Sequence, residues 1–571
     1  MKLLPALVGL AVAAAPVMAQ VTPGLSIASS PTQASLSHAQ GSTARAIRFL
    51  NRASFGATSA DTNFVLTQGE RAWLNAQFNQ PPTLAVPILE AFGCAPDQAG
   101  FDVDSCPGYD WPAFVELRRD TWWTHALNAP DQLRQRVAFA LSEIFVISDS
   151  GGSLTPRATT VADFHDTLLE HSFGTYRELL EAVTRHGAMG SYLSMARNAK
   201  ENAIPGIFPD ENFAREVMQL FSVGTRMLDD SGRPLVDPQG NEIPTYDQDV
   251  VTDMARALTG WTFDDGVTVP DDDYWAFRAV DIEAGPMRAW PAFHDTGAKS
   301  VLGGVVIPAG GTAESDLEAV MDALDQHPNV PPFMSRQLIQ RLVTSNPTDE
   351  YVARVVRVWK DDGQGVRGNL EAVLRSILLD REAQHGHRIL PQRFGKLKEP
   401  ILMLTNLWRA FGASGAVTDV PNGSSYSFGQ APHSAASVFN FFRPDFQNEA
   451  LARENLVSPE LEILTEAQLT RLSNRFAFVI FEGSNIGPNP SYVDPLLNLD
   501  WLRNLSAIPE VLLAIVDERL CGGLMSAATK QAIVERLDTV PFFGVGVDPG
   551  MWRVRECFSL VLLSSDFALQ R

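Results

Sequence analysis

The sequence lacks the short motifs that identify many common enzymes. It contains no G-x-S-x-G turn, no H-E-x-x-H helix, no P-loop and no EF-hand calcium loop. The spacings C-x-x-C and C-x-x-C-H are missing too, and no nucleotide or nicotinamide signature is present. The sequence therefore gives no motif for the common hydrolases and metalloproteases, for an attached haem or for a nicotinamide cofactor.

Long apolar runs are also scarce. The run from Leu3 to Pro16 is shorter than the roughly 20 residues of a membrane span, and no second long run follows it. It comes after Lys2 and leads into Val17-Met-Ala19, which is the pattern of a secretory signal peptide cleaved after Ala19. A buried N-terminal helix is the alternative. We predict a signal peptide over residues 1–19, export to the periplasm or the extracellular medium, and no membrane span in the mature chain.

Basic residues are also scarce relative to acidic ones. The chain has 45 Lys and Arg against 67 Asp and Glu, which gives a formal net charge of -22. Such a charge repels nucleic acids and anionic lipid head groups, and it favours solubility. No stripe of Lys and Arg offsets it. Nucleic-acid binding is therefore not expected.

Cysteine is rare, with four residues in the chain. Cys94 and Cys106 bracket a short loop, and Cys521 and Cys557 bracket the last helical hairpin. Four cysteines allow three pairings, and the sequence does not choose among them rigorously. Because export places the chain in an oxidising compartment, we predict the two local disulfides, Cys94 with Cys106 and Cys521 with Cys557.

Apolar periodicity predicts an all-α fold. Residues 20–41 are rich in Ser, Thr, Pro, Gln and Ala, and a disordered leader is expected there. From Ser42 onward, apolar residues recur at the three-and-four spacing of helices. Turn residues within 227–243 predict a small β-hairpin, and residues 301–307 resemble a strand. The expected architecture is a large multi-helix assembly with small β-hairpin insertions.

The length of the chain predicts more than one packed region. We expect an N-terminal helical region with the candidate site over residues 42–311. A middle helical region follows over residues 312–411. Residues 412–571 are expected to form a loop followed by a C-terminal helical region.

Three polar clusters in the N-terminal region are candidates for a site. On a predicted helix over residues 209–223, Asn212, Arg215 and Glu216 lie among many apolar residues, so part of this polar set must be buried or line a cleft. A buried charge needs a partner. Glu216 is therefore interpreted either as an acid, a base or a metal ligand in a pocket, or as part of a buried ion network that fixes helix packing.

The other two clusters follow in the chain. Asp253 and Arg256 lie three residues apart on a predicted helix over residues 247–259. His294, Asp295 and Lys299 lie within six residues of one loop. A histidine on such a loop can shuttle protons or bind a metal, and it can equally be a structural hydrogen-bonding residue. Both interpretations stay open on the residues alone.

Weaker candidates lie outside these clusters. Taken one by one they are interpreted as structural, although two residues of the last group could reach a site. The candidates are His165, His171 and His186, then Arg134 and Arg136, and finally His433, Asn440 and Arg443.

The clusters resemble the bacterial "domain of unknown function 1800" family. The resemblance rests on Asn212-Phe-Ala-Arg-Glu-Val-Met-Gln-Leu-Phe, Ala255-Arg-Ala-Leu-Thr-Gly-Trp, His294-Asp-Thr-Gly-Ala-Lys, Ser437-Val-Phe-Asn-Phe-Phe-Arg-Pro and Leu562-Leu-Ser-Ser-Asp-Phe. These runs extend over nearly all of the mature chain. The family usually has Glu where this chain has Gln219, so no charged carboxylate acts at that position here.

The resemblance implies a large exported bacterial protein. Members are often encoded beside an exported protein that resembles sulfatases and alkaline phosphatases. By analogy, the resemblance implies such a protein as a partner and sulfated or phosphorylated extracellular material as the setting.

Two functions are consistent with the sequence, which does not decide whether the chain is an enzyme. In the first, it is an exported enzyme in which Glu216 or Asp253 is the acid or base and His294 shuttles protons. The substrate is then bound by the remaining polar residues, namely Asn212, Arg215, Arg256, Asp295 and Lys299. A divalent cation fits the same carboxylates and histidine. In the second, the chain is a non-catalytic scaffold or partner of the sulfatase-like protein, and these residues form a structural ion network.

Overall fold

The computed structural model describes residues 33–92, 111–202, 206–264, 274–275, 284–414, 429–482, 495–540 and 548–571. The predicted signal peptide lies outside these residues. Contacts divide the chain into residues 1–41 and residues 42–571. Helix α1 begins at Gln33, so the end of the predicted leader over 20–41 is helical, in line with its Ala, Leu and Gln content. All that follows concerns residues 42–571.

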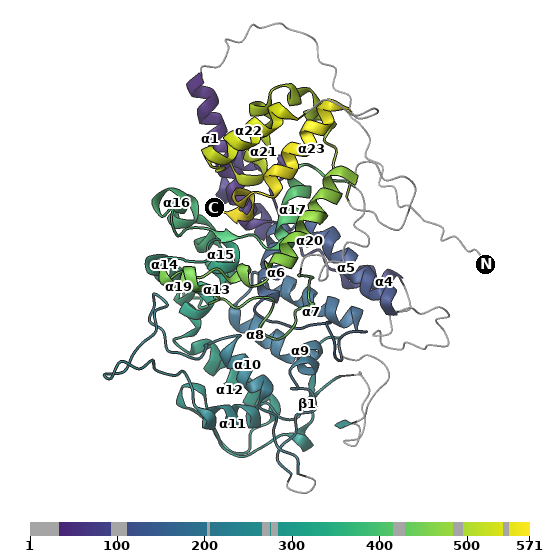
Figure 1. The fold of residues 1–571 in the computed structure, drawn as a ribbon. Coiled ribbons are helices and arrows are strands. Elements are labelled where there is room, and N and C mark those ends of the chain that lie inside the picture. The colour runs from purple at the N-terminus through teal and green to yellow at the C-terminus, as the bar shows by residue number, and fades with distance from the viewer. Residues whose placement is uncertain are drawn as a thin grey trace, which may run out of the picture. The chain divides into compact units, whose positions relative to one another are not determined.

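Helices make up most of the described chain, which confirms the predicted fold class (Figure 1). The first are α1 (Gln33–Ala53), α2 (Ser59–Gln68), α3 (Glu70–Phe78), α4 (Val86–Phe92), α5 (Trp111–Asn128), α6 (Gln132–Ser142), α7 (Ala158–His171), α8 (Tyr176–Arg185), α9 (Gly187–Tyr192), α10 (Asn212–Gln219) and α11 (Gln248–Ala257). Next come α12 (Ala313–Gln326), α13 (Val330–Leu342), α14 (Asp349–Lys360), α15 (Leu370–Leu379), α16 (Arg381–Ile389) and α17 (Pro400–Ala410). The last are α19 (Glu449–Arg453), α20 (Glu466–Ala477), α21 (Pro509–Cys521), α22 (Ala527–Thr539), α23 (Pro549–Leu562) and α24 (Ser565–Ala568).

Strands form three small antiparallel sheets in the described part of the chain. They pair β1 (Trp261–Thr262) with β2 (Arg288–Ala289), β3 (Lys299–Val301) with β4 (Val305–Ile307), and β5 (Lys396–Leu397) with β6 (Leu569–Gln570). The short helices η3 (Pro291–Phe293), η4 (Leu302–Gly304), η5 (Pro459–Glu462), η6 (Phe478–Glu482) and η7 (Asp500–Ala507) complete the elements. The small β-hairpin insertions of the predicted fold are thus present.

Residues 227–243 do not form the simple hairpin that their turns predict. Three short segments pair in turn, because the amides of Met227, Leu235 and Ile243 donate to the carbonyls of Ile243, Met227 and Leu235. The turn signals mark two reversals of the chain within this stretch, and two reversals produce three segments rather than two.

Local capping signals explain where the helices near the candidate site begin. Thr175 and Glu178 form a capping box at the start of α8, and the Asp247 side chain accepts a hydrogen bond from the Val250 amide at the start of α11. These bonds satisfy amides that have no partner inside the helix. The helices then bury one apolar face each, as their three-and-four spacing predicts.

Two large apolar cores hold the helices together. The first runs from α1 to the residues after α16, and it includes most buried side chains of α6 to α15. The second joins α5 and α17 to the C-terminal helices α20 to α23. Trp123 lies between Trp122 and Trp408 there, with ring centroids 5.4 and 5.8 Å away in edge-to-face geometry. The contact between Trp123 and Trp408 joins α5 to α17.

The predicted disulfide between Cys521 and Cys557 is not formed, and both residues are free thiols. The prediction assumed a hairpin of two helices, whereas three helices, α21 to α23, pack on one another here. Burial raises the pKa of each thiol to about 12, so the reactive thiolate is scarce. Cys94 and Cys106 lie outside the described residues.

Non-reducing peptide mapping tests this correction. Denatured, unreduced protein that is treated with an alkylating reagent should give the Cys521 and Cys557 peptides alkylated and unlinked, because neither thiol is bonded. A reduced sample serves as the reference. A cross-linked peptide that contains both residues would contradict the structure.

No described helix combines the length and the apolar character that crossing a membrane requires.

Candidate functional site

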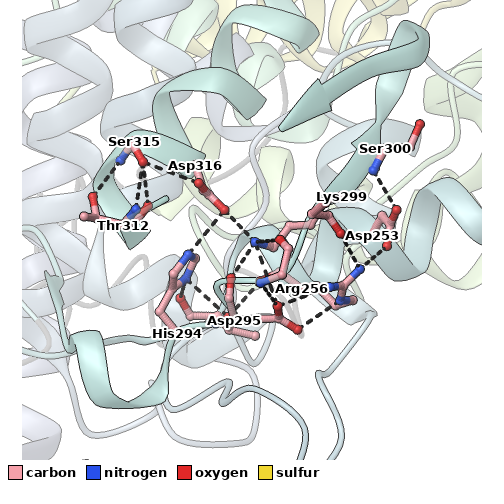
Figure 2. Close-up of polar contacts among 12 residues, drawn as sticks. Asp253, Arg256, His294, Asp295, Lys299, Ser300, Thr312, Ser315 and Asp316 are labelled. Atoms are coloured by element: carbon pink, nitrogen blue, oxygen red, sulfur yellow. Dashed lines mark hydrogen bonds and ion pairs between the residues drawn. The ribbon is translucent and has the colours of Figure 1, made fainter. Parts of the chain in front are cut away.

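The structure brings five of the eight predicted site residues together. Asp253 and Arg256 lie on α11, while His294, Asp295 and Lys299 lie on the segment from the end of η3 to the start of β3 (Figure 2). Helix α11 packs directly against β3. The two clusters therefore meet at the contact between one helix and one hairpin.

Arg256 is held between two carboxylates. Its Nη1 lies 2.7 Å from Asp253 Oδ1, and its Nε and Nη2 lie 2.9 and 3.2 Å from the two oxygens of Asp295. The hydrogen bonds that Arg256 donates to Asp295 raise the pKa of Arg256. Burial by itself would raise the pKa of Asp295, but Arg256 and the Gly297 amide outweigh it and lower that pKa. The Ser300 amide binds the second oxygen of Asp253 at 2.6 Å, so all three charges are fixed.

Lys299 forms the other half of the network, with a partner that the sequence analysis missed. Lys299 Nζ lies 2.7 Å from Asp316 Oδ2, and both side chains are at most 1% exposed. His294 Nε2 lies 3.3 Å from the same oxygen, and His294 Nδ1 lies 3.0 Å from the Thr259 carbonyl (Figure 2). Lys299 also donates to the carbonyl of Asp295. Asp316 lies in the first turn of α12, where an acidic residue is usually taken as a solvent-facing partner of the helix dipole.

Two glycines allow the backbone to approach these side chains. Gly260 has φ +84°, and a Cβ there would lie 2.9 Å from the Cβ of His294. A Cβ at Gly297 would lie 2.5 Å from Nη2 of Arg256. Only glycine fits both positions without displacing a charged or aromatic side chain.

We call Asp253, Arg256, His294, Asp295, Lys299 and Asp316 the α11–β3 network. Among the described residues, no buried nitrogen or oxygen of these six side chains is left without a hydrogen-bond partner. Satisfied and deeply buried polar groups fix how elements pack. Within the described residues, the buried polar atoms of the network are thus satisfied by one another and by nearby backbone groups.

The other three predicted residues lie on α10 and have different partners. Asn212 donates to the Leu193 carbonyl at 3.3 Å, and Arg215 lies 3.1 Å from Glu211. Glu216 is 8% exposed, its Oε2 has no hydrogen-bond partner among the described residues, and burial raises its pKa. These three residues have their own partners, although α10 packs directly on α11 and Arg215 lies 3.2 Å from Gln248 of that helix. Within the part of the chain that the structure describes, no group of three or more His, Cys, Asp or Glu side chains could hold a metal ion.

A second group of buried charges was not predicted. It draws on α6, α13, β5, the start of α17 and η5, and we call it the central charge cluster; it consists of Arg136, Glu143, Arg341, Lys396, Glu399 and Glu460. Lys396 Nζ lies 2.9 Å from Glu460 Oε1 and 3.4 Å from Glu399 Oε1. Arg341 donates to the Glu143 carbonyl at 2.9 Å, and its Nε lies 3.9 Å from the Glu143 carboxylate. Three cations thus surround three carboxyls.

Glu143 and Glu399 of this cluster are close enough for the charge of Glu399 to affect Glu143. Burial, and after it the neighbouring Glu399 charge, raises the pKa of Glu143 well above its usual range. Burial alone would raise the pKa of Glu399 as well, but Lys396, Glu143 and Arg136 lower it. The surroundings therefore favour the protonated form of Glu143 and the ionised form of Glu399.

Several polar atoms of the central charge cluster lack partners. Arg136 Nε and Nη1, Arg341 Nε and Glu460 Oε2 have no hydrogen-bond partner among the described residues. Such atoms are rare in folded proteins because they cost free energy. In this respect the central charge cluster differs from the saturated α11–β3 network. It retains polar groups that a bound molecule could satisfy.

Residues 429–440 form hydrogen bonds to both Glu143 and Glu399. Gln430 donates to Glu399 at 2.7 Å, and Asn440 donates to Glu143 at 3.5 Å. Asn440 has φ 64°, and His433 between them has φ 54°. Left-handed conformations of residues other than glycine cost roughly 1 kcal/mol or more each, and they cluster at functional sites.

Two residues in the middle of the same segment, His433 and Ser434, belong to a third group of polar contacts. His433 Nε2 lies 2.9 Å from His165 Nδ1, and Ser434 donates to Asp149. Arg119 lies 2.9 Å from the other oxygen of Asp149. The weaker candidates His165, His433 and Asn440 thus belong to buried polar contacts rather than to plain apolar packing.

Of the central charge cluster, the sequence analysis named Arg136 alone, as a weaker candidate. In the structure, helix α6 is buried along its length from Gln132 to Leu141, so the charge of Arg136 on it requires a buried partner. The contacts around this cluster join residues that are far apart in the sequence. Glu143 and Asn440, for example, are separated by 297 positions. Periodicity does not reveal contacts at that separation.

The residues that match a known family include both the α11–β3 network and the central charge cluster. A family model described as "Protein of unknown function (DUF1800)" matches residues 48–566, from α1 to α24. No curated protein and no solved structure matches the chain.

Proposed function

This chain belongs to the DUF1800 family of proteins of unknown function, and on that premise we propose that it is an exported enzyme with its acid–base centre at Glu143 and Glu399. The observation that carries the proposal is the opposite direction of the pKa shifts of these two buried carboxyls, which lie in one cluster with Lys396 3.4 Å from Glu399. Such a pair supplies a proton donor and a proton acceptor at the same pH.

The reaction class is hydrolysis of an extracellular polymer. Glu143 donates its proton to the leaving oxygen, and the ionised Glu399 accepts a proton from the attacking water. Lys396 and Arg136 favour the ionised form of Glu399, which the role of proton acceptor requires. The groups that this chemistry needs are thus supplied by the chain itself.

Access to the pair requires movement of residues 429–440. Gln430 and Asn440 cover the two carboxyls, while Phe439 beside Asn440 is 48% exposed. The left-handed backbone at His433 and Asn440 makes this covering conformation less stable than a relaxed one. The segment is therefore suited to moving aside when a substrate binds.

Export is part of the proposal and rests on the N-terminal sequence. Lys2, the apolar run from Leu3 to Pro16 and the small residues before Gln20 support a cleaved signal peptide. The working compartment is then the periplasm or the extracellular medium.

A second candidate function is a non-catalytic scaffold or partner of a sulfatase-like exported protein. The observation in its favour is the saturation of the α11–β3 network, because a site that was selected for rigidity alone would have this property. This second function differs from the first because the chain would not need any catalytic activity of its own.

Activity measurements on the exported, mature protein test the proposal. We expect hydrolysis of at least one member of a panel of sulfated, phosphorylated and plain polysaccharides. Glu143→Gln and Glu399→Gln should each reduce the rate by about 100-fold or more, the usual contribution of a general acid or base. Glu143→Gln should fold as well as the wild type, because glutamine resembles the protonated carboxyl in shape.

Glu216→Gln and Asp253→Asn are the matched controls, since each also removes one carboxylate from the N-terminal region. Both should retain activity whenever they fold. Loss of activity in Glu216→Gln alone would move the centre to α10. A wild-type protein that is inactive on the whole panel would overturn the enzyme proposal in favour of the scaffold.

A further inference from the structure

A groove on the surface of the chain is lined by an unusual number of arginines. It has a volume of about 860 Å³ and lies between α14, the loop after it, α15 and the start of α16, with one residue from α3. Helices α14, α15 and α16 lie side by side (Figure 1). Five arginines line it, namely Arg71, Arg354, Arg357, Arg375 and Arg381. Such a concentration stands out in a chain with a net charge of -22.

Two of these arginines are neutralised by carboxylates of the groove wall. Arg354 binds both oxygens of Asp380 at 2.6 and 2.8 Å. Arg375 lies 2.9 Å from Glu371. In each of these two pairs, the positive charge of the arginine is balanced by one carboxylate.

The other two acids of the wall are bound by their own backbone. Asp361 accepts hydrogen bonds from the Gly363 and Gly365 amides at 2.8 and 3.0 Å. Asp362 accepts from the Gln364 amide at 2.8 Å and from the Asn369 side chain, and these bonds lower its pKa. Both bonds to Asp361 end on Oδ1, and among the described residues neither acid forms an ion pair with a guanidinium group of the groove.

Three guanidinium groups remain. Arg71, Arg357 and Arg381 are exposed, and no ion pair or hydrogen bond joins their side chains to another residue in the described ranges. They come from three separate helices, α3, α14 and α16. A guanidinium group binds planar or tetrahedral oxyanions through two parallel hydrogen bonds. The groove therefore presents three separate sites for oxyanion groups.

The neutral lining indicates what carries those groups. None of the lining residues is aromatic, so the groove has no surface on which nucleic-acid bases could stack. Gln364 and Ser376 add neutral hydrogen-bonding groups of the kind that hydroxyls need. The volume lies within the range of about 300–1,000 Å³ that sites for drug-sized ligands occupy.

We propose that this groove binds an acidic polysaccharide, with Arg71, Arg357 and Arg381 each holding one sulfate or carboxylate group of a sugar chain. The sugar hydroxyls meet Gln364 and Ser376. This binding goes beyond the proposed hydrolysis and does not depend on it. It is measured without any turnover.

Binding of modified dextrans to the mature protein tests the proposal. Dextran sulfate and carboxymethyl dextran distinguish sulfate from carboxylate recognition, and unmodified dextran is the neutral reference. We expect saturable binding of at least one charged form, weakened by salt, and none of the neutral form. The triple variant Arg71→Gln/Arg357→Gln/Arg381→Gln should bind at least ten times more weakly.

The matched control is Arg226→Gln/Arg453→Gln/Arg503→Gln, which removes the same charge from exposed arginines outside the groove. It should bind like the wild type, and thermal unfolding should show that both triple variants are folded. Equal loss in the two triple variants, or undiminished binding by the groove variant, would overturn the proposal. Binding of duplex DNA as strong as that of the charged dextrans would overturn the assignment to a sugar chain. None of these results bears on Glu143 and Glu399.

Discussion

Replacing Lys299 with methionine is expected to lower the free energy of unfolding by about 3–5 kcal/mol, the usual cost of removing one partner of a buried ion pair. The loss would leave the Asp316 carboxylate, which is 1% exposed, without its ammonium partner at 2.7 Å. Methionine is chosen because it nearly fills the space of the lysine stem. Urea unfolding of wild type and variant at pH 7 measures the difference.

Two further variants make this result specific to burial. Arg226→Met breaks an ion pair with Glu242 of similar length, 2.9 Å, whose side chains are 60% and 41% exposed; we expect a change of about 0.5 kcal/mol or less. The double variant Lys299→Met/Asp316→Leu should recover most of the loss, because it leaves no unpaired charge. If Lys299→Met cost no more than Arg226→Met, the α11–β3 network would not be the structural unit described above.

Acidification from pH 7 to pH 5 is expected to destabilise the fold through the buried pair His165 and His433. Burial lowers the pKa of His433 to about 3, and it lowers that of His165 well below its usual value. The unfolded chain takes up protons at these residues as the pH falls below about 6.5, whereas the folded chain does not. Stability from this pair is therefore fully present above that pH and declines below it, by about 2 kcal/mol for His433 at pH 5.

His433→Asn isolates this contribution. Asparagine tolerates the left-handed backbone that His433 adopts, at φ 54°, and it does not titrate. The free energy of unfolding of wild type and variant should therefore converge by about 2 kcal/mol between pH 7 and pH 5. Carboxyls such as Glu143 titrate in both proteins and cancel in the comparison. A difference that stays constant with pH would contradict the prediction, because it would mean that His433 takes up protons as readily in the folded chain as in the unfolded one.

The helices could be predicted because their signals are local. The Thr175 capping box and the Asp247 cap mark the starts of α8 and α11 within a few residues, and each helix then shows its apolar spacing. Residues 301–307, predicted to resemble a strand, instead contain the turn between β3 and β4, because Gly303 and Gly304 adopt positive φ and reverse the chain. Residues 227–243 were misjudged because turn residues reveal that the chain reverses, but not how often the resulting segments pair.

The candidate site was predictable only in part, because burial and pairing depend on contacts that are distant in sequence. Asp253, Arg256 and His294 were identified and do meet, yet the pattern could not tell a saturated network from a site. Asp316 was missed because an acid at a helix start is ordinarily solvated. Glu399 was missed although its cation, Lys396, is only three residues away, because the burial of that pair is set by the folded core; Glu460 lies far from Lys396 in the sequence.

The central charge cluster also has a consequence for the time course of synthesis. Glu143 is made 297 residues before Asn440, so at 5–20 residues per second it waits roughly 15–60 s for that partner. During this interval α6 carries charges that cannot yet be buried with their partners. Final packing is therefore an event of the nearly complete polypeptide. The predicted signal peptide would meet the export machinery while the chain has not yet closed its core.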